Sequence, residues 1–144
     1  MGARLAVPVS LWRRESGLPK ISIIDDDESS LEAMLSLVKS LGFKVQAFSS
    51  ALEFLASPYV HATDCLIADI NMPRMTGVEL HRHLVRTGYL IPTILVTAYS
   101  DDGVQARAVA EGVLRCLSKP VDGASLLECV HLALQGIEPG KNHS

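Results

Sequence analysis

The sequence predicts a single α/β domain, in which a doubly wound sheet of five parallel strands alternates with five helices. From Lys20 onward, short apolar runs alternate with segments of helical periodicity, which is the pattern of βα units around a parallel sheet. The run Cys65–Ala68 is apolar throughout, as expected for a strand with both faces covered. The 144 residues, 48% of them hydrophobic, suffice for one globular core and leave no room for a second domain.

The amino-terminal half is expected to contain three strands, at Ile21–Ile24, Lys44–Phe48 and Cys65–Ala68. A helix follows the first strand, because apolar residues recur at spacings of three and four from Leu31 to Leu41. Gly42 is the signal that ends this helix. A short helix is expected from Ser50 to Ala56, before Pro58.

The carboxyl-terminal half is expected to continue the alternation with three helices and two strands. A helix over Gly77–Arg86 precedes the strand Thr93–Thr97. The next helix, Asp102–Ala110, is rich in alanine and only modestly apolar, so we expect it to be the least firmly packed. The last strand and helix are expected at Leu114–Ser118 and Ala124–Leu134.

The flanks and the composition limit the function. Residues 19–137 are expected to form the domain, residues 1–18 a flexible extension and residues 138–144 a tail. The longest uncharged stretch, 87–100, is too short to cross a bilayer, and the amino terminus lacks the order of parts of a signal peptide. A net charge of −3 argues against a nucleic-acid binder. Three widely spaced cysteines, Cys65, Cys116 and Cys129, favour buried thiols in a reducing cytoplasm.

Polar residues follow four of the expected strands at their carboxyl ends: Asp25, Asp26 and Asp27 after the first, Asp69 after the third, Thr97 at the end of the fourth and Lys119 after the fifth. Because these ends converge on one crevice in an open α/β sheet, we expect the side chains to meet. Carboxylates that lie so near to one another repel, and a cation is needed to compensate their charge. Oxygen ligands without cysteine or histidine favour Mg²⁺. A carboxylate beside a metal, an ammonium and a hydroxyl is suited to attack phosphorus.

Four motifs carry a resemblance to a known family. They are ISIIDDDES, LIADINMPRMTGVEL, ILVTAYS and LSKP, in this order between about Leu18 and Ile137. Together they resemble the receiver domain of two-component response regulators, the CheY-like superfamily. The resemblance implies a flavodoxin-like sheet with strand order 2-1-3-4-5. It also implies a cis Lys119–Pro120 bond, which the small trans preference of X-Pro bonds permits.

The resemblance also assigns roles to individual residues. Asp69 would accept a phosphoryl group in a Mg²⁺-dependent reaction, and Thr97 and Lys119 would contact that group. The Mg²⁺ ligands would be the carboxylates of Asp25, Asp26 and Asp69 and the backbone carbonyl of Asn71. Such a domain is not an enzyme in the ordinary sense, because it catalyses its own phosphorylation and dephosphorylation.

The implied partners are proteins. The phosphoryl donor would be a sensor histidine kinase or a phosphotransfer protein. The output would be a downstream protein or a homodimer, bound through the face made by 102–110, 114–118 and 124–134. The tail of seven residues, 138–144, is too short for a helix-turn-helix, so we expect no nucleic acid to be bound by this chain itself.

Several alternatives stay open at this stage. Cys116 stands where relatives usually carry Tyr or Phe, and Val121 stands where they carry Phe. The chain could therefore be a degenerate receiver that binds partners without phosphorylation, or the receiver fragment of a longer DNA-binding regulator. Asp27 could simply cap the helix that follows it. His81 and His83 are expected to be surface residues or residues with satisfied hydrogen bonds, not metal ligands.

Overall fold

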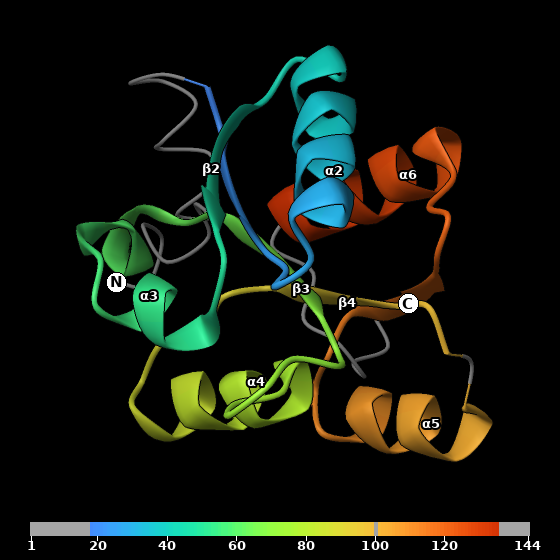
Figure 1. The fold of residues 1–144 in the computed structure, drawn as a ribbon. Helices are drawn as coiled ribbons and strands as arrows, with labels where there is room; N and C mark the ends of the chain where they lie inside the picture. The colour runs from blue at the N-terminus through green and yellow to red at the C-terminus, as the bar shows by residue number, and fades with distance from the viewer. Residues whose placement is uncertain (1–17, 100, 136–144) are drawn as a thin grey trace, which may run out of the picture.

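The computed structural model describes residues 18–99 and 101–135 (Figure 1). Five parallel strands form one sheet in the order β2-β1-β3-β4-β5. The strands are β1 (Lys20–Ile24), β2 (Lys44–Phe48), β3 (Cys65–Asp69), β4 (Thr93–Thr97) and β5 (Arg115–Ser118). The predicted fold class and strand order are confirmed.

The helices cover both faces of the sheet. They are α2 (Glu28–Ser40), α3 (Ala51–Leu55), α4 (Gly77–Arg86), α5 (Asp102–Ala110) and α6 (Gly123–Leu134). Figure 1 shows α2 and α6 on one side of the sheet and α3, α4 and α5 on the other. This arrangement follows from right-handed crossovers. The chain moves from β1 to β2 in one direction across the sheet and then from β2 through β3 and β4 to β5 in the other, so the first connecting helix lies on one face and the next three lie on the opposite face.

Two apolar clusters fill the space between the sheet and the helices. Ile21 and Ile23 of β1 pack on the side of α2 and α6, whereas Ile24 packs on the side of α3 and α4. All five residues of β3 and all five of β4 are buried. The central strands therefore read as continuous apolar runs because each face meets a helical layer.

The expected and observed elements differ in small ways. A 3₁₀ helix, η2 (Pro58–Ala62), occupies the link before β3. This helix was not predicted, although Pro58 in its first turn and the Ser57 side chain, which accepts from the Tyr59 amide, are both start signals. The last strand begins at Arg115 rather than Leu114. Asp27 sits at the N-cap position of α2, but its side chain makes no capping bond to the described residues.

The expectation for His81 was wrong, because this histidine is neither on the surface nor satisfied. Its side chain is buried in α4, and its Nδ1 has no hydrogen-bond partner among the described residues. Gly112, at φ +111°, lies against the ring, since a Cβ built there would come 3.6 Å from Cε1. Burial lowers the pKa of His81.

Two further expectations concern membrane segments and cysteines in the described residues, 18–99 and 101–135. Within those ranges, no helix has both the length and the apolar character needed to cross a membrane. Cys65 and Cys129 are buried free thiols, whereas Cys116 is a free thiol that is only half-buried. The proposed tail, and the proposed extension apart from Leu18, lie outside the described residues.

Candidate functional site

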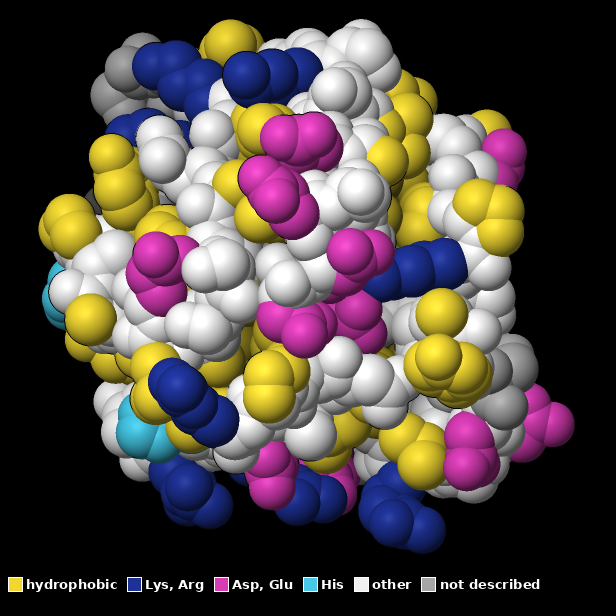
Figure 2. All heavy atoms as spheres, in the orientation of Figure 1, with side chains coloured by type: hydrophobic (Ala, Val, Ile, Leu, Met, Phe, Trp, Pro, Cys, Tyr) yellow, Lys and Arg dark blue, Asp and Glu magenta, His cyan; other side chains and the backbone are white. Residues whose placement is uncertain are grey.

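The polar residues that end the strands meet at the carboxyl edge of the sheet. Asp25 follows β1, Asp69 ends β3 and Thr97 ends β4, and all three are buried. The parallel register fixes their depth, because Ala68 pairs with Ile24 and Thr97 pairs with Ser118. Figure 2 shows acidic side chains gathered at the centre of the visible face, with a basic side chain directly beside them.

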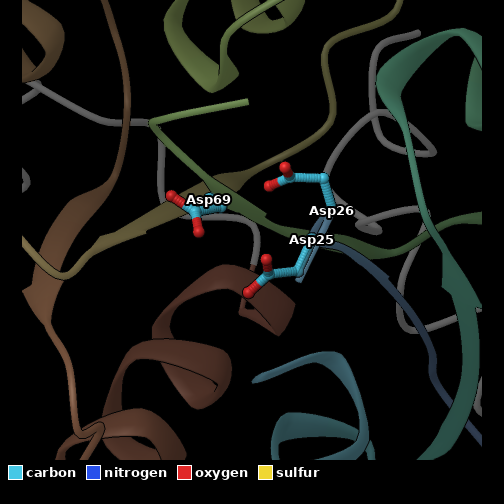
Figure 3. A group of neighbouring side chains, drawn as sticks. All are labelled: Asp25, Asp26 and Asp69. Carbon is cyan, nitrogen blue, oxygen red and sulfur yellow. The ribbon is translucent and has the colours of Figure 1, made fainter. Parts of the chain in front are cut away.

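Three carboxylates form a compact group in this edge. Asp25, Asp26 and Asp69 each place an oxygen within 4.8 Å of the others, and Figure 3 shows them converging from the ends of β1 and β3. Asp25 and Asp69 are buried and Asp26 is exposed. An all-oxygen group that opens to water on one side fits a hard divalent cation such as Mg²⁺, which keeps part of its hydration.

Lys119 supplies a positive charge between the two buried carboxylates. Its Nζ donates to Asp25 Oδ2 at 2.8 Å and to Asp69 Oδ2 at 2.7 Å. Its own backbone amide donates to the Thr97 carbonyl at 2.8 Å, and the following bond to Pro120 is cis. The lysine is therefore anchored to β4 while its ammonium holds the carboxylates together.

Burial and hydrogen bonding shift the pKa values of these groups in opposite directions. Burial raises the pKa of Asp69, and the nearby Asp25 charge adds to this, so its pKa stays above the usual range despite the bonds from Lys119 and Asn71. Burial acts the same way on Asp25, but bonds from Lys119, Ser30 and the Asp27 amide outweigh it and lower the pKa. For Lys119, the two carboxylates outweigh burial and raise the pKa. Lys119 therefore stays charged.

A second set of hydrogen bonds surrounds the Thr97 hydroxyl. The Asn71 side-chain amide donates to Thr97 Oγ1 at 3.0 Å, and the Tyr99 backbone amide also donates to it at 3.0 Å. The hydroxyl itself donates to the Tyr99 carbonyl at 3.1 Å. The sequence did not predict this bond between the Asn71 side chain and Thr97. The available signal in the sequence was that Asn71 follows Asp69 by only two residues. This spacing keeps Asn71 at the site, where its backbone amide donates to Asp69 Oδ1 at 2.8 Å.

A groove that the sequence did not predict lies beside the carboxylates. It has a volume of about 410 Å³ and runs between α2 and the link from β5 to α6. Its lining is largely apolar and consists of Ser30, Ala33, Met34, Leu37, Lys119, Pro120 and Val121. Lys119 therefore borders both the groove and the carboxylate group.

Cys116 lies one layer below the site. It pairs with Leu95 across β4 and β5 and packs against the apolar cluster on the side of α3 and α4. Burial raises the pKa of its thiol. The side chain is therefore a small packing residue of this cluster.

Comparisons with known proteins agree with this arrangement. Response regulator protein TmoT of Ectopseudomonas mendocina is 38% identical over 115 residues, which are 80% of this chain and 52% of the relative. Transcriptional regulatory protein TdiR of Thauera aromatica is 31% identical over 114 residues, 79% of this chain and 50% of the relative. The chain thus spans about half the length of the curated relatives it matches.

The solved structures and the family model point the same way. A response regulator receiver domain protein from Clostridium thermocellum superimposes with a TM-score of 0.76 at 27% identity, covering 83% of this chain and 96% of that one. The model of the response regulator receiver domain matches residues 21–131, which contain the whole carboxyl edge described above. The chain therefore belongs to the family of response regulator receiver domains.

Proposed function

We propose that this receiver domain accepts a phosphoryl group on Asp69 from a histidine kinase or a phosphotransfer protein, in a Mg²⁺-dependent reaction, and thereby switches its protein contacts. The observation that carries this proposal is the setting of Asp69. Its carboxylate ends β3, lies within 4.8 Å of the Asp25 and Asp26 carboxylates, and receives a 2.7 Å hydrogen bond from Lys119. Carboxylates that can hold a divalent cation, with a lysine beside them, are suited to bind a phosphoryl group and to stabilise its negative charge during transfer.

Each residue has a defined task in the transfer. An Asp69 oxygen attacks phosphorus, so that a P–O bond forms while the P–N bond to the donor histidine breaks. Asp25, Asp26, Asp69 and the Asn71 carbonyl would hold Mg²⁺, and the bound ion would supply positive charge to neutralise the phosphoryl oxygens. Lys119 already contacts Asp69 and is able to follow the phosphoryl group, while Thr97 turns its hydroxyl toward it.

The donor has to bring its phosphohistidine to Asp69. The apolar groove between α2 and the β5–α6 link borders Lys119 and so offers a protein surface next to the carboxylates. For the output, we propose the face made by α5, β5 and α6, used for a downstream protein or a homodimer. The three free thiols suit a cytoplasmic location.

The reaction is tested by incubating the chain with acetyl phosphate and Mg²⁺ and measuring the intact mass. We expect the mass of one added phosphoryl group, and no addition when a chelator removes the metal. Loss of the label over time would measure the self-catalysed dephosphorylation. A chain that stays unlabelled would favour the degenerate receiver, which binds partners without phosphorylation.

Asp26→Asn is expected to weaken Mg²⁺ binding by about tenfold, because it removes a direct ligand and one negative charge. The affinity is measured by titrating Mg²⁺ and following the NMR chemical shifts of the backbone amides at the site. Asp27→Asn is the matched control, since Asp27 is the neighbouring exposed aspartate and does not belong to the group of three. Equal Mg²⁺ affinity of the Asp26 variant and the control would contradict the role of Asp26.

A second candidate function follows from the length of the relatives. The curated relatives extend well beyond the matched region, and one of them is named a transcriptional regulatory protein. The chain could therefore act as the receiver part of a longer DNA-binding regulator. The proposal for the chain itself remains protein contacts alone, and salt-resistant, sequence-specific DNA binding by these 144 residues would refute it.

Phosphorylation is expected to change the loop after Thr97 and α5 more than the surroundings of Cys116. Cysteine is too small to fill the space that the turning hydroxyl would vacate, so packing there differs little between the two states. Amide exchange with and without beryllium trifluoride measures this. Changed protection around Cys116, with residues 98–110 unaffected, would contradict this expectation.

A further inference from the structure

We propose that the side-chain amide of Asn71 is a positioning group that holds the Thr97 hydroxyl away from the phosphoryl site in the unphosphorylated protein. The amide thereby opposes phosphorylation, and the strength of its hydrogen bond to Thr97 sets how readily the site switches. This inference rests on the proposed acceptor function of Asp69. The observation behind it is the 3.0 Å hydrogen bond from Asn71 Nδ2 to Thr97 Oγ1.

The hydroxyl of Thr97 has no bonding capacity left in this arrangement. A hydroxyl offers one donor and two acceptor sites. The donor is taken by the Tyr99 carbonyl, and one acceptor site is taken by the Tyr99 amide. The remaining acceptor site requires a donor, which fixes the Asn71 side chain with its nitrogen toward Thr97.

A phosphoryl oxygen on Asp69 can accept a hydrogen bond but cannot donate one. Thr97 must therefore withdraw its O–H from the Tyr99 carbonyl before it can bind that oxygen. The turn also moves the lone pair to which Asn71 donates, so the Asn71 bond is broken or weakened in the same step. Because the Thr97 side chain is buried, few waters are available to stabilise an intermediate orientation.

The same hydroxyl also tethers the loop that leads to α5. Tyr99 is bound to Thr97 through both its amide and its carbonyl, and Asp101, two residues on, caps α5 by accepting from the Gly103 and Val104 amides. Turning the hydroxyl releases both Tyr99 bonds at once. Asn71 therefore controls, through one hydroxyl, the loop that would carry the switch in place of the missing aromatic ring.

The test measures the affinity of the full chain for beryllium trifluoride at saturating Mg²⁺. Asn71→Ala removes the donor but keeps the backbone carbonyl, and we expect the variant to bind the analogue about threefold to tenfold more tightly, the value of one net hydrogen bond. In the ligand-free protein, the Tyr99 amide is expected to exchange faster in Asn71→Ala than in the wild type, because the hydroxyl that it bonds is freer to turn.

A double-mutant cycle shows whether Asn71 acts through the hydroxyl. In a Thr97→Val background, which lacks the hydroxyl, Asn71→Ala is expected to have no effect on analogue affinity. In a Thr97→Ser background, which keeps it, the gain is expected to return.

Three results would overturn the inference, and a fourth would refute the proposed acceptor function as well. Unchanged or weaker analogue binding by Asn71→Ala would show that the amide does not oppose the switch. An equal gain in the Thr97→Val background, or no gain in the Thr97→Ser background, would show that it does not act through Thr97. If the wild-type chain fails to bind the analogue at all, the acceptor function itself is refuted, together with this inference.

Discussion

Asp69→Asn is expected to abolish the phosphoryl mass gained from acetyl phosphate. The amide that replaces the carboxylate is not a nucleophile, and it cannot form the acyl phosphate bond. The substitution keeps the size of a buried side chain, and the raised pKa of Asp69 means that its negative charge does not favour the folded state. The variant is therefore expected to remain folded, so that lost labelling reports lost chemistry.

Asp64→Asn is the matched control for this experiment. Asp64 directly precedes β3, whereas Asp69 ends it, and both aspartates are buried. Asp64 Oδ2 accepts from the Lys20 amide at the opposite edge of the sheet, a bond that an asparagine oxygen can also accept. We expect full labelling of Asp64→Asn, measured by intact mass. Persistent labelling of Asp69→Asn would place the acceptor elsewhere.

Gly77→Ala is expected to lower the free energy of unfolding by about 3 kcal/mol, at the upper end of what overpacking costs. A Cβ on Gly77 would lie 2.5 Å from the Asp69 carbonyl oxygen and 3.0 Å from Leu95 Cδ2. The carbonyl cannot move away freely because it belongs to the end of β3, and the next carbonyl, that of Ile70, accepts from the Gly77 amide at 3.1 Å. Either α4 or the end of β3 must therefore shift.

Gly103→Ala gives the matched control, because Gly103 also lies in the first turn of a helix. Among the described residues, a Cβ there would meet only Asp101 Oδ1, at an ordinary 3.4 Å. This variant is expected to stay within about 1 kcal/mol of the wild type, on the stabilising side, since alanine reduces the freedom of the unfolded chain. Urea unfolding followed by circular dichroism gives both values. A similar change in both variants would show that the space at Gly77 is not the cause.

The local part of this fold was readable from the sequence. The helix α4 was predicted with its observed bounds, because its apolar residues follow helical spacing. The structure adds that Thr76 is its N-cap. β2 and β4 were also predicted at their observed bounds. The meeting of Asp25 with Asp69 was predicted from parallel strand topology, which brings the carboxyl ends together whatever the details of packing.

The contacts of single side chains were not readable in this way. Asp27 stands at the N-cap of α2, yet its side chain makes no capping bond within the described part of the chain. His81 was expected to be on the surface or to have satisfied hydrogen bonds, yet the turn at Gly112 lies against its buried ring and its Nδ1 has no partner among the described residues. Both outcomes depend on a neighbouring segment whose approach leaves no periodic signal in the sequence.

The sequence by itself therefore determined the elements, the edge of the sheet at which they place their polar residues and the oxygen-rich character of the site. Only the tertiary structure decided how those residues bond. Lys119 divides its ammonium between two carboxylates 94 and 50 positions away, and Asn71 reaches a hydroxyl 26 positions away. The physical reason is range: periodicity and capping act within a few residues, whereas hydrogen bonds form only when packing and strand register bring distant atoms to within about 3 Å.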